Sequence, residues 1–115
     1  MNIEAMTKWI EALEDPANEK RQIRGRFSDG KGGVCAEGLA YEVVCGVQRT
    51  KEDGFPTSDI DLVANGLGWT PGELVPTAVV FENGWTEAVH QLNDAGWSFW
   101  DIAQALRATH LKENT

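Results

Sequence analysis

The chain has 115 residues, of which 42% are hydrophobic and 24% are charged. That length suits one domain, residues 1–115, able to bury a core without metal or disulfide staples. With 18 acidic and 10 basic residues the formal net charge is -8, which disfavours nucleic-acid binding through phosphate contacts and permits a partner with a basic surface.

The sequence has no pattern typical of a secretory leader and no apolar run of membrane-spanning length, so we expect a cytoplasmic protein without membrane contact. In that compartment the two cysteines, Cys35 and Cys45, are expected to be free thiols. On one continuous helix they would lie about 15 Å apart, beyond the ~7 Å limit for a disulfide. Nothing in the composition suggests a cofactor, and the oligomeric state is left open.

The first element is an amphipathic helix over residues 3–14. Its apolar residues recur at steps of three and four, and Trp9 lies on the margin of the same face. The Asp15-Pro16 pair ends this helix because a proline disfavours helical geometry at the residue before it. Residues 17–20 are then expected to form a loop.

Alternating polar and apolar residues predict a short strand over residues 22–27, weakened by Gly25. The glycine-rich segment at 28–33 follows it and precedes a helix, where free backbone N–H groups attract anions. Neither of the known phosphate-loop glycine spacings is present there. We therefore interpret the segment as a turn, with phosphate binding as a secondary option.

Residues 34–45 are apolar around most of a helical circumference, which predicts a central, buried helix. Cys35 falls in its first turn, where a helix N-terminus lowers a thiol pKa, so Cys35 with His90 is a weak candidate for a cysteine-dependent enzyme. The simpler interpretation is a buried cysteine that packs as a small hydrophobic residue. No cysteine-histidine family signature surrounds it, so no catalytic residue is assigned.

The second half of the chain predicts more helix than strand. Proline, glycine and capping residues divide it into a loop at 46–58, a helix at 59–65 capped by Ser58, a single turn at 70–73, an extended or strand segment at 77–81, and helices at 85–93 and 99–109. The segment at 77–81 could pair with residues 22–27. The expected fold class is α+β: a mainly helical single domain with a short two- or three-stranded β element and a C-terminal helical hairpin.

That C-terminal hairpin resembles a helix-turn-helix only in outline. Its second helix offers Trp100, Asp101, Gln104 and Arg107, of which one is basic, so we do not expect DNA binding. His90 and Asp94 share a helix face and could form half of a metal site or an oriented histidine, but two ligands are not a site. No metal is therefore predicted.

The binding candidates are a basic segment and one tryptophan. Half of the ten basic residues lie between positions 20 and 31. They could pair with surplus carboxylates on a solvated face, or form a site for an anionic ligand or an acidic partner surface. Trp100, next to the inward Phe99, is the tryptophan most expected to be exposed. The candidate binding residues are Arg21, Arg24, Arg26, Lys31 and Trp100.

Several of these motifs together resemble a family of small uncharacterised bacteriophage and prophage proteins. The matching segments are K-W-I-x-A-L at 8–13, the Gln22 strand, the cysteine-glycine helix start at 35–38, and L-N-D-x-G-x-S-F-x-x-I-A at 92–103. This sequence has Val34 where the family pattern begins a cysteine pair, Glu37 for a usual leucine, and Cys45-Gly46 shifted from the family's C-D position. These departures argue against a required thiol pair, and the resemblance implies a phage-type source without implying a catalytic residue.

The expected function is a non-catalytic, small acidic accessory protein that binds and modulates a host or defence protein in the host cytoplasm. A small-ligand protein that sequesters an anionic nucleotide through Arg24 and Arg26 is the alternative. A cysteine-dependent enzyme is the third.

Overall fold

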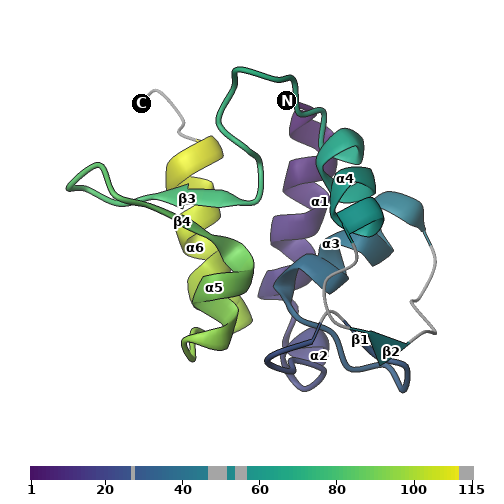
Figure 1. The fold of residues 1–115 in the computed structure, drawn as a ribbon. Helices are drawn as coiled ribbons and strands as arrows, with labels where there is room; N and C mark the ends of the chain where they lie inside the picture. Colours follow the sequence, from purple (N-terminus) through teal and green to yellow (C-terminus); the bar gives the residue numbers. More distant parts are fainter. Residues whose placement is uncertain (27, 47–51, 54–56, 112–115) are drawn as a thin grey trace.

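The computed structural model describes residues 1–26, 28–46, 52–53 and 57–111. Helix α1 (Ile3–Glu14) lies at the centre, with α6 (Phe99–His110) packed on one side and α3 (Ala36–Cys45) on the other, where α4 (Thr57–Gly66) covers α3 (Figure 1). The radius of gyration is 13.0 Å, as expected for a compact chain of this length. The α+β class is confirmed.

Helix α1 has the predicted bounds, and its buried face consists of Met6, Trp9, Ile10 and Leu13. Trp9 is fully buried instead of marginal, and its indole N–H donates to the Ala36 carbonyl of α3 at 3.0 Å. The loop expected at 17–20 is wrong, because Pro16 opens a short helix, α2 (Pro16–Glu19). Proline suits the first helical position, and the Asp15 side chain caps the helix by accepting from Ala17 N.

The strand expected at 22–27 is also wrong. Gln22 makes one isolated parallel bridge to Val34, and Gly25 then takes the left-handed conformation (φ 77°), which breaks an extended ladder. The two-residue strand β1 (Ser28–Asp29) begins later and pairs with β2 (Glu52–Asp53), inside the region expected to be a loop. Phe27, at the end of the expected strand, lies outside the described residues, as do 47–51 and 54–56 of the expected loop.

Helices α3 and α4 both differ slightly from their predicted bounds. α3 starts at Ala36 with Cys35 as its N-cap, and Gly46 ends it in the left-handed conformation. α4 begins at Thr57, so Ser58 lies within the helix instead of capping it. The two helices approach closely at their ends, so a Cβ added to Gly66 would collide with the Val44 side chain.

The segment at 77–81 forms a strand, β3 (Ala78–Val80), but its partner is β4 (Thr86–Ala88) in an antiparallel hairpin. Residues 86–88 were expected to be helical, and helix α5 (Val89–Asp94) begins only after them. Asn83-Gly84 is a strong hairpin signal, and Gly84 has φ 83°. The other side of β3 contacts α6, where Val80 N donates to the Thr109 hydroxyl at 3.1 Å.

The C-terminal hairpin of α5 and α6 is confirmed, with the shorter first helix. Gly96 (φ 107°) turns the chain between the helices, and Ser98 caps α6 by accepting from Asp101 N. The buried face of α6, formed by Phe99, Ile102, Ala103 and Leu106, is as predicted and completes a core shared with α1 and α3. Among the described residues, no helix combines the length and apolar character needed to cross a membrane.

Candidate functional site

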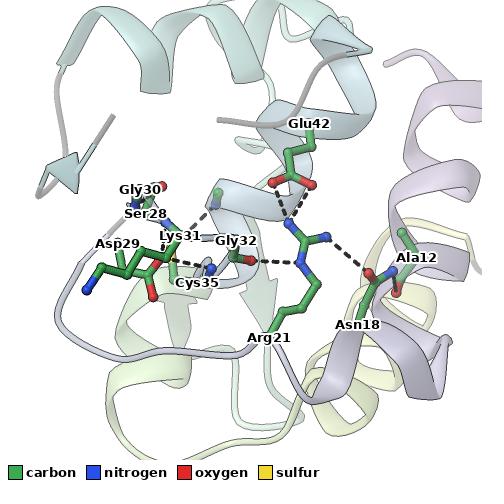
Figure 2. Close-up of polar contacts among 12 residues, drawn as sticks. Ala12, Asn18, Arg21, Ser28, Asp29, Gly30, Lys31, Gly32, Cys35 and Glu42 are labelled. Carbon is green, nitrogen blue, oxygen red and sulfur yellow. Dashed lines mark hydrogen bonds and ion pairs between the residues drawn. The ribbon is translucent and has the colours of Figure 1, made fainter. Parts of the chain in front are cut away.

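Arg21, a predicted binding residue, is directed inward (Figure 2). One terminal nitrogen contacts both Glu42 carboxylate oxygens, at 2.9 and 2.6 Å, and Nε donates to the Gly32 carbonyl at 2.7 Å. The other terminal nitrogen donates to Asn18 Oδ1 at 3.2 Å. The guanidinium thus ties α2, the glycine-rich turn and α3 together. We assign Arg21 a structural role, which agrees with the alternative that these basic residues pair with carboxylates, and a binding role for Arg21 stays a prediction.

The glycine-rich turn is filled by its own side chains. The Asp29 carboxylate accepts from Lys31 N at 2.7 Å and from Gly33 N at 2.9 Å, and the Ser28 hydroxyl accepts from Gly30 N at 3.1 Å (Figure 2). The N–H groups of Lys31 and Gly33, that of Lys31 most strongly, hold the pKa of Asp29 below its usual range. A bound phosphate would require the same N–H groups, so this geometry weakens the interpretation of the turn as a phosphate site.

The other basic candidates face solvent. Arg24 and Arg26 are exposed on either side of Gly25, and Lys31 is exposed in the glycine-rich turn. Gly25 itself is fixed, because its N–H donates to Asp94 Oδ1 at 2.8 Å. The basic segment at 20–31 therefore divides into one part-buried arginine, Arg21, and four exposed cations, of which Lys20 is the fourth.

Asn93, which the sequence did not single out, is the central polar residue of this region. Its side chain is fully buried, and its Oδ1 accepts from Gln22 Nε2 at 2.9 Å and from Ala36 N at 3.1 Å. Its Nδ2 donates to the Ile23 carbonyl at 2.7 Å. One amide thus connects α5, the segment after α2 and the N-terminus of α3. An asparagine beside Leu92 on the inner face of α5 was the available signal.

His90 pairs with a residue that the sequence did not suggest. Its Nδ1 lies 3.6 Å from Oε1 of Glu37, whose side chain is 4% exposed in the first turn of α3. This partner, reinforced weakly by Asp94, raises the pKa of His90 against the opposing effect of burial. Oε2 of Glu37 is buried without a hydrogen-bond partner among the described residues. Within those residues, no cluster of three or more possible metal ligands occurs.

The pKa of the second histidine is shifted in the opposite direction. His110 is half-buried at the end of α6 with Nε2 2.7 Å from the Ala78 carbonyl, and burial lowers its pKa. A raised histidine pKa adds stability below the unfolded value, about 6.5, that is lost as pH rises through the folded pKa. A lowered histidine pKa adds stability above about 6.5 that is lost as pH falls through the folded pKa. The two contributions therefore oppose each other.

Single histidine substitutions should reveal these opposed contributions. In His110→Gln, where His90 remains, we expect the free energy of unfolding to fall as pH rises through neutrality. In His90→Gln, where His110 remains, we expect it to fall as pH drops below about 6.5. Urea unfolding between about pH 5 and 8 measures both slopes. The double variant is the control and should show neither; slopes of the same sign in the two single variants would contradict these assignments.

Cys35 does not suit nucleophilic chemistry at neutral pH. Its side chain is fully buried, and burial raises its pKa to about 12, outweighing the Gly38 N–H that donates to Sγ at 3.4 Å. Both cysteines are free thiols, and Cys45 is the exposed one. The structure therefore supports the packing interpretation of Cys35.

Trp100 is exposed, as predicted, with 53% of its surface accessible. It lies beside a pocket of about 330 Å³ between the end of α1, α2 and the start of α6, which we call the Trp100 pocket. Its lining consists of Leu13, Glu14, Asp15, Pro16, Glu19, Lys20 and Trp100. A second tryptophan, Trp85 immediately before β4, is 62% exposed; the sequence does not predict this, because its helical spacing places Trp85 on the apolar face of an amphipathic helix. The binding role of Trp100 stays a prediction.

Comparisons of the chain with protein-family models, with curated proteins and with solved structures found no match. The resemblance to phage proteins is consequently an expectation from sequence motifs alone.

Proposed function

We propose that this chain is a non-catalytic accessory protein of the small acidic phage type, which binds and modulates a host or defence protein in the host cytoplasm. The observation that carries the proposal is an exposed tryptophan beside an apolar pocket on a molecule of net charge -8. Tryptophan is enriched among the residues that dominate binding energy at protein interfaces.

The geometry of the other candidates supports a binding role over an enzymatic one. The thiol of Cys35 is buried with a strongly raised pKa, which disfavours the cysteine-dependent alternative. His90 contacts Glu37, which supplies a structural partner for the only other residue considered for catalysis.

An anionic-nucleotide binder is the second candidate function. It is favoured by the exposure of Arg24 and Arg26 on either side of the fixed Gly25. It is weakened because Arg21 is engaged with Glu42 and because Asp29 occupies the backbone donors of the glycine-rich turn. We therefore rank it below protein binding.

Affinity capture tests the two functions against each other. We expect tagged protein, expressed in a bacterial host, to recover a stoichiometric host protein that an unrelated acidic protein with the same tag does not recover. Expression should also produce a growth or phage-defence phenotype. No enriched protein together with no phenotype would count against the proposal. A nucleotide that raises the melting temperature of the wild type, and much less that of an Arg24→Glu/Arg26→Glu variant, would favour the second candidate.

A further inference from the structure

We infer that the Trp100 pocket receives one large apolar side chain from a basic protein segment, whose lysines or arginines contact the carboxylates at the rim. This inference rests on the proposed function and names the chemistry of the partner. Three observations carry it: the construction of the pocket, the fixed positions of its walls, and the sign of the charge around it.

The pocket is built for an apolar anchor of limited size. Leu13, which is 1% exposed, supplies the apolar part of the lining together with Pro16 and Trp100. A volume of about 330 Å³ is at the low end for ligand sites, which suits a single side chain better than a cofactor. Trp100 is also surplus to the core, because the buried face of α6 is completed by other residues.

The walls of the pocket are held in place without a ligand. Glu19 accepts from the backbone N–H groups of Phe99 and Trp100 at 3.2 and 3.4 Å, which fixes α2 against the start of α6. Glu14 is bound by Arg107 at 2.6 and 2.9 Å and by Gln104 at 2.8 Å. A site preformed in this way loses little conformational entropy on binding, which favours affinity for a short segment.

The charge around the pocket selects a basic partner. Arg107 offsets the charge of Glu14, so Asp15 and Glu19 are the acidic residues of the lining that remain without a basic side chain of their own among the described residues. Among the described residues of the lining, Lys20 is the basic one and offsets one of these two carboxylates, so an acidic excess remains on a molecule of net charge -8. A lysine or arginine beside the anchor can meet these carboxylates or the face of the Trp100 ring. A second copy of this acidic chain is a poor occupant for the same reason.

The larger hollow between α1 and α6 gives weaker support for a binding site. It measures about 810 Å³ and is lined by Ile3, Thr7, Gln104, Arg107, Ala108, His110 and Leu111. The charge of Arg107 is offset by Glu14, to which Gln104 also donates, and His110 contacts the Ala78 carbonyl. Among the described residues of this lining, no uncompensated charge identifies an occupant.

Synthetic peptides test the inference without knowledge of the natural partner. The probe is a short lysine-rich peptide with one central phenylalanine, compared with the same peptide carrying alanine at the centre and with one carrying glutamates for the lysines. Each peptide is titrated into the protein while the NMR signal of the Trp100 indole is monitored. The first peptide should bind, and the other two should bind at least about tenfold more weakly. Trp100→Ala, followed by calorimetry, should weaken the first interaction about 30-fold.

Trp85→Ala is the matched control, because Trp85 is the more exposed tryptophan and lies on the β3–β4 hairpin. It should leave the Kd unchanged, and unfolding curves of both variants should show intact folds. The inference is overturned if the wild type binds no lysine-rich peptide at about 1 mM, if the glutamate peptide binds equally well, or if Trp85→Ala weakens binding as much as Trp100→Ala. Self-association lost in Trp100→Ala would assign the pocket to a second copy and also overturn it.

The outcomes separate this inference from the proposed function. If the protein captured from the host is retained by Trp100→Ala, the accessory function stands and the pocket is not its docking site. If the wild type captures no protein and causes no phenotype, while the lysine-rich peptide still binds at Trp100, the pocket chemistry stands and the accessory function fails.

Discussion

Asn93→Ala should lower the free energy of unfolding by about 3 kcal/mol, because each buried polar group left without its partner costs roughly 1–3 kcal/mol. The substitution removes the acceptor for Ala36 N and the donor to the Ile23 carbonyl, and Ala36 is fully buried. Gln22 loses the same acceptor but keeps the Trp97 carbonyl at 2.7 Å. Equilibrium unfolding in urea measures the change.

Asn65→Ala is the matched control for this effect, since Asn65 is an exposed asparagine near the end of α4. Its substitution should change stability by no more than about 0.5 kcal/mol. If Asn93→Ala were as well tolerated as the control, the buried amide would not be connecting the two halves of the chain.

Arg21→Ala should lower the free energy of unfolding by about 2 kcal/mol, because it leaves Glu42 and the Gly32 carbonyl without their donors. The side chains of Arg21 and Glu42 are 26% and 13% exposed, so solvent reduces the penalty below that of a fully buried pair. Urea unfolding of Arg21→Ala, Glu42→Ala and the double variant gives the coupling energy, which should favour the pair by about 1 kcal/mol or more.

Arg24→Ala serves as the comparison, because Arg24 lies in the same basic segment but is exposed. It should alter stability by less than about 0.5 kcal/mol. Equal losses for Arg21→Ala and Arg24→Ala would contradict the division of the basic segment into a structural arginine and exposed cations.

The helices with regular apolar spacing could be predicted from the sequence, and the short extended segments could not. α1 and α6 each bury several residues at steps of three and four, so the pattern determines the element and its inner face. Residues 22–27 contain two apolar residues in alternation, too few to outweigh Gly25 and the side-chain contacts from Asn93 and Asp94. At 85–88, the hairpin signal of Asn83-Gly84 outweighed helical spacing.

The candidate site, too, could be predicted from the sequence only in part. The exposure of Trp100 follows from the pattern of α6 alone. The ion pair of Arg21 with Glu42 and the contact of His90 with Glu37 depend on how separate elements pack, which local spacing does not encode. The Trp100 pocket likewise requires α2, an element absent from the prediction, to lie against α6.

The contacts between β3 and α6 have a consequence for solubility. The backbone groups of Ala78 and Val80 point away from β4, and they meet His110 and Thr109 of the helix. An unpaired strand edge is a template on which other chains can assemble into larger sheets. Helix α6 shields that edge of β3, so this side of the hairpin is protected against edge-to-edge aggregation.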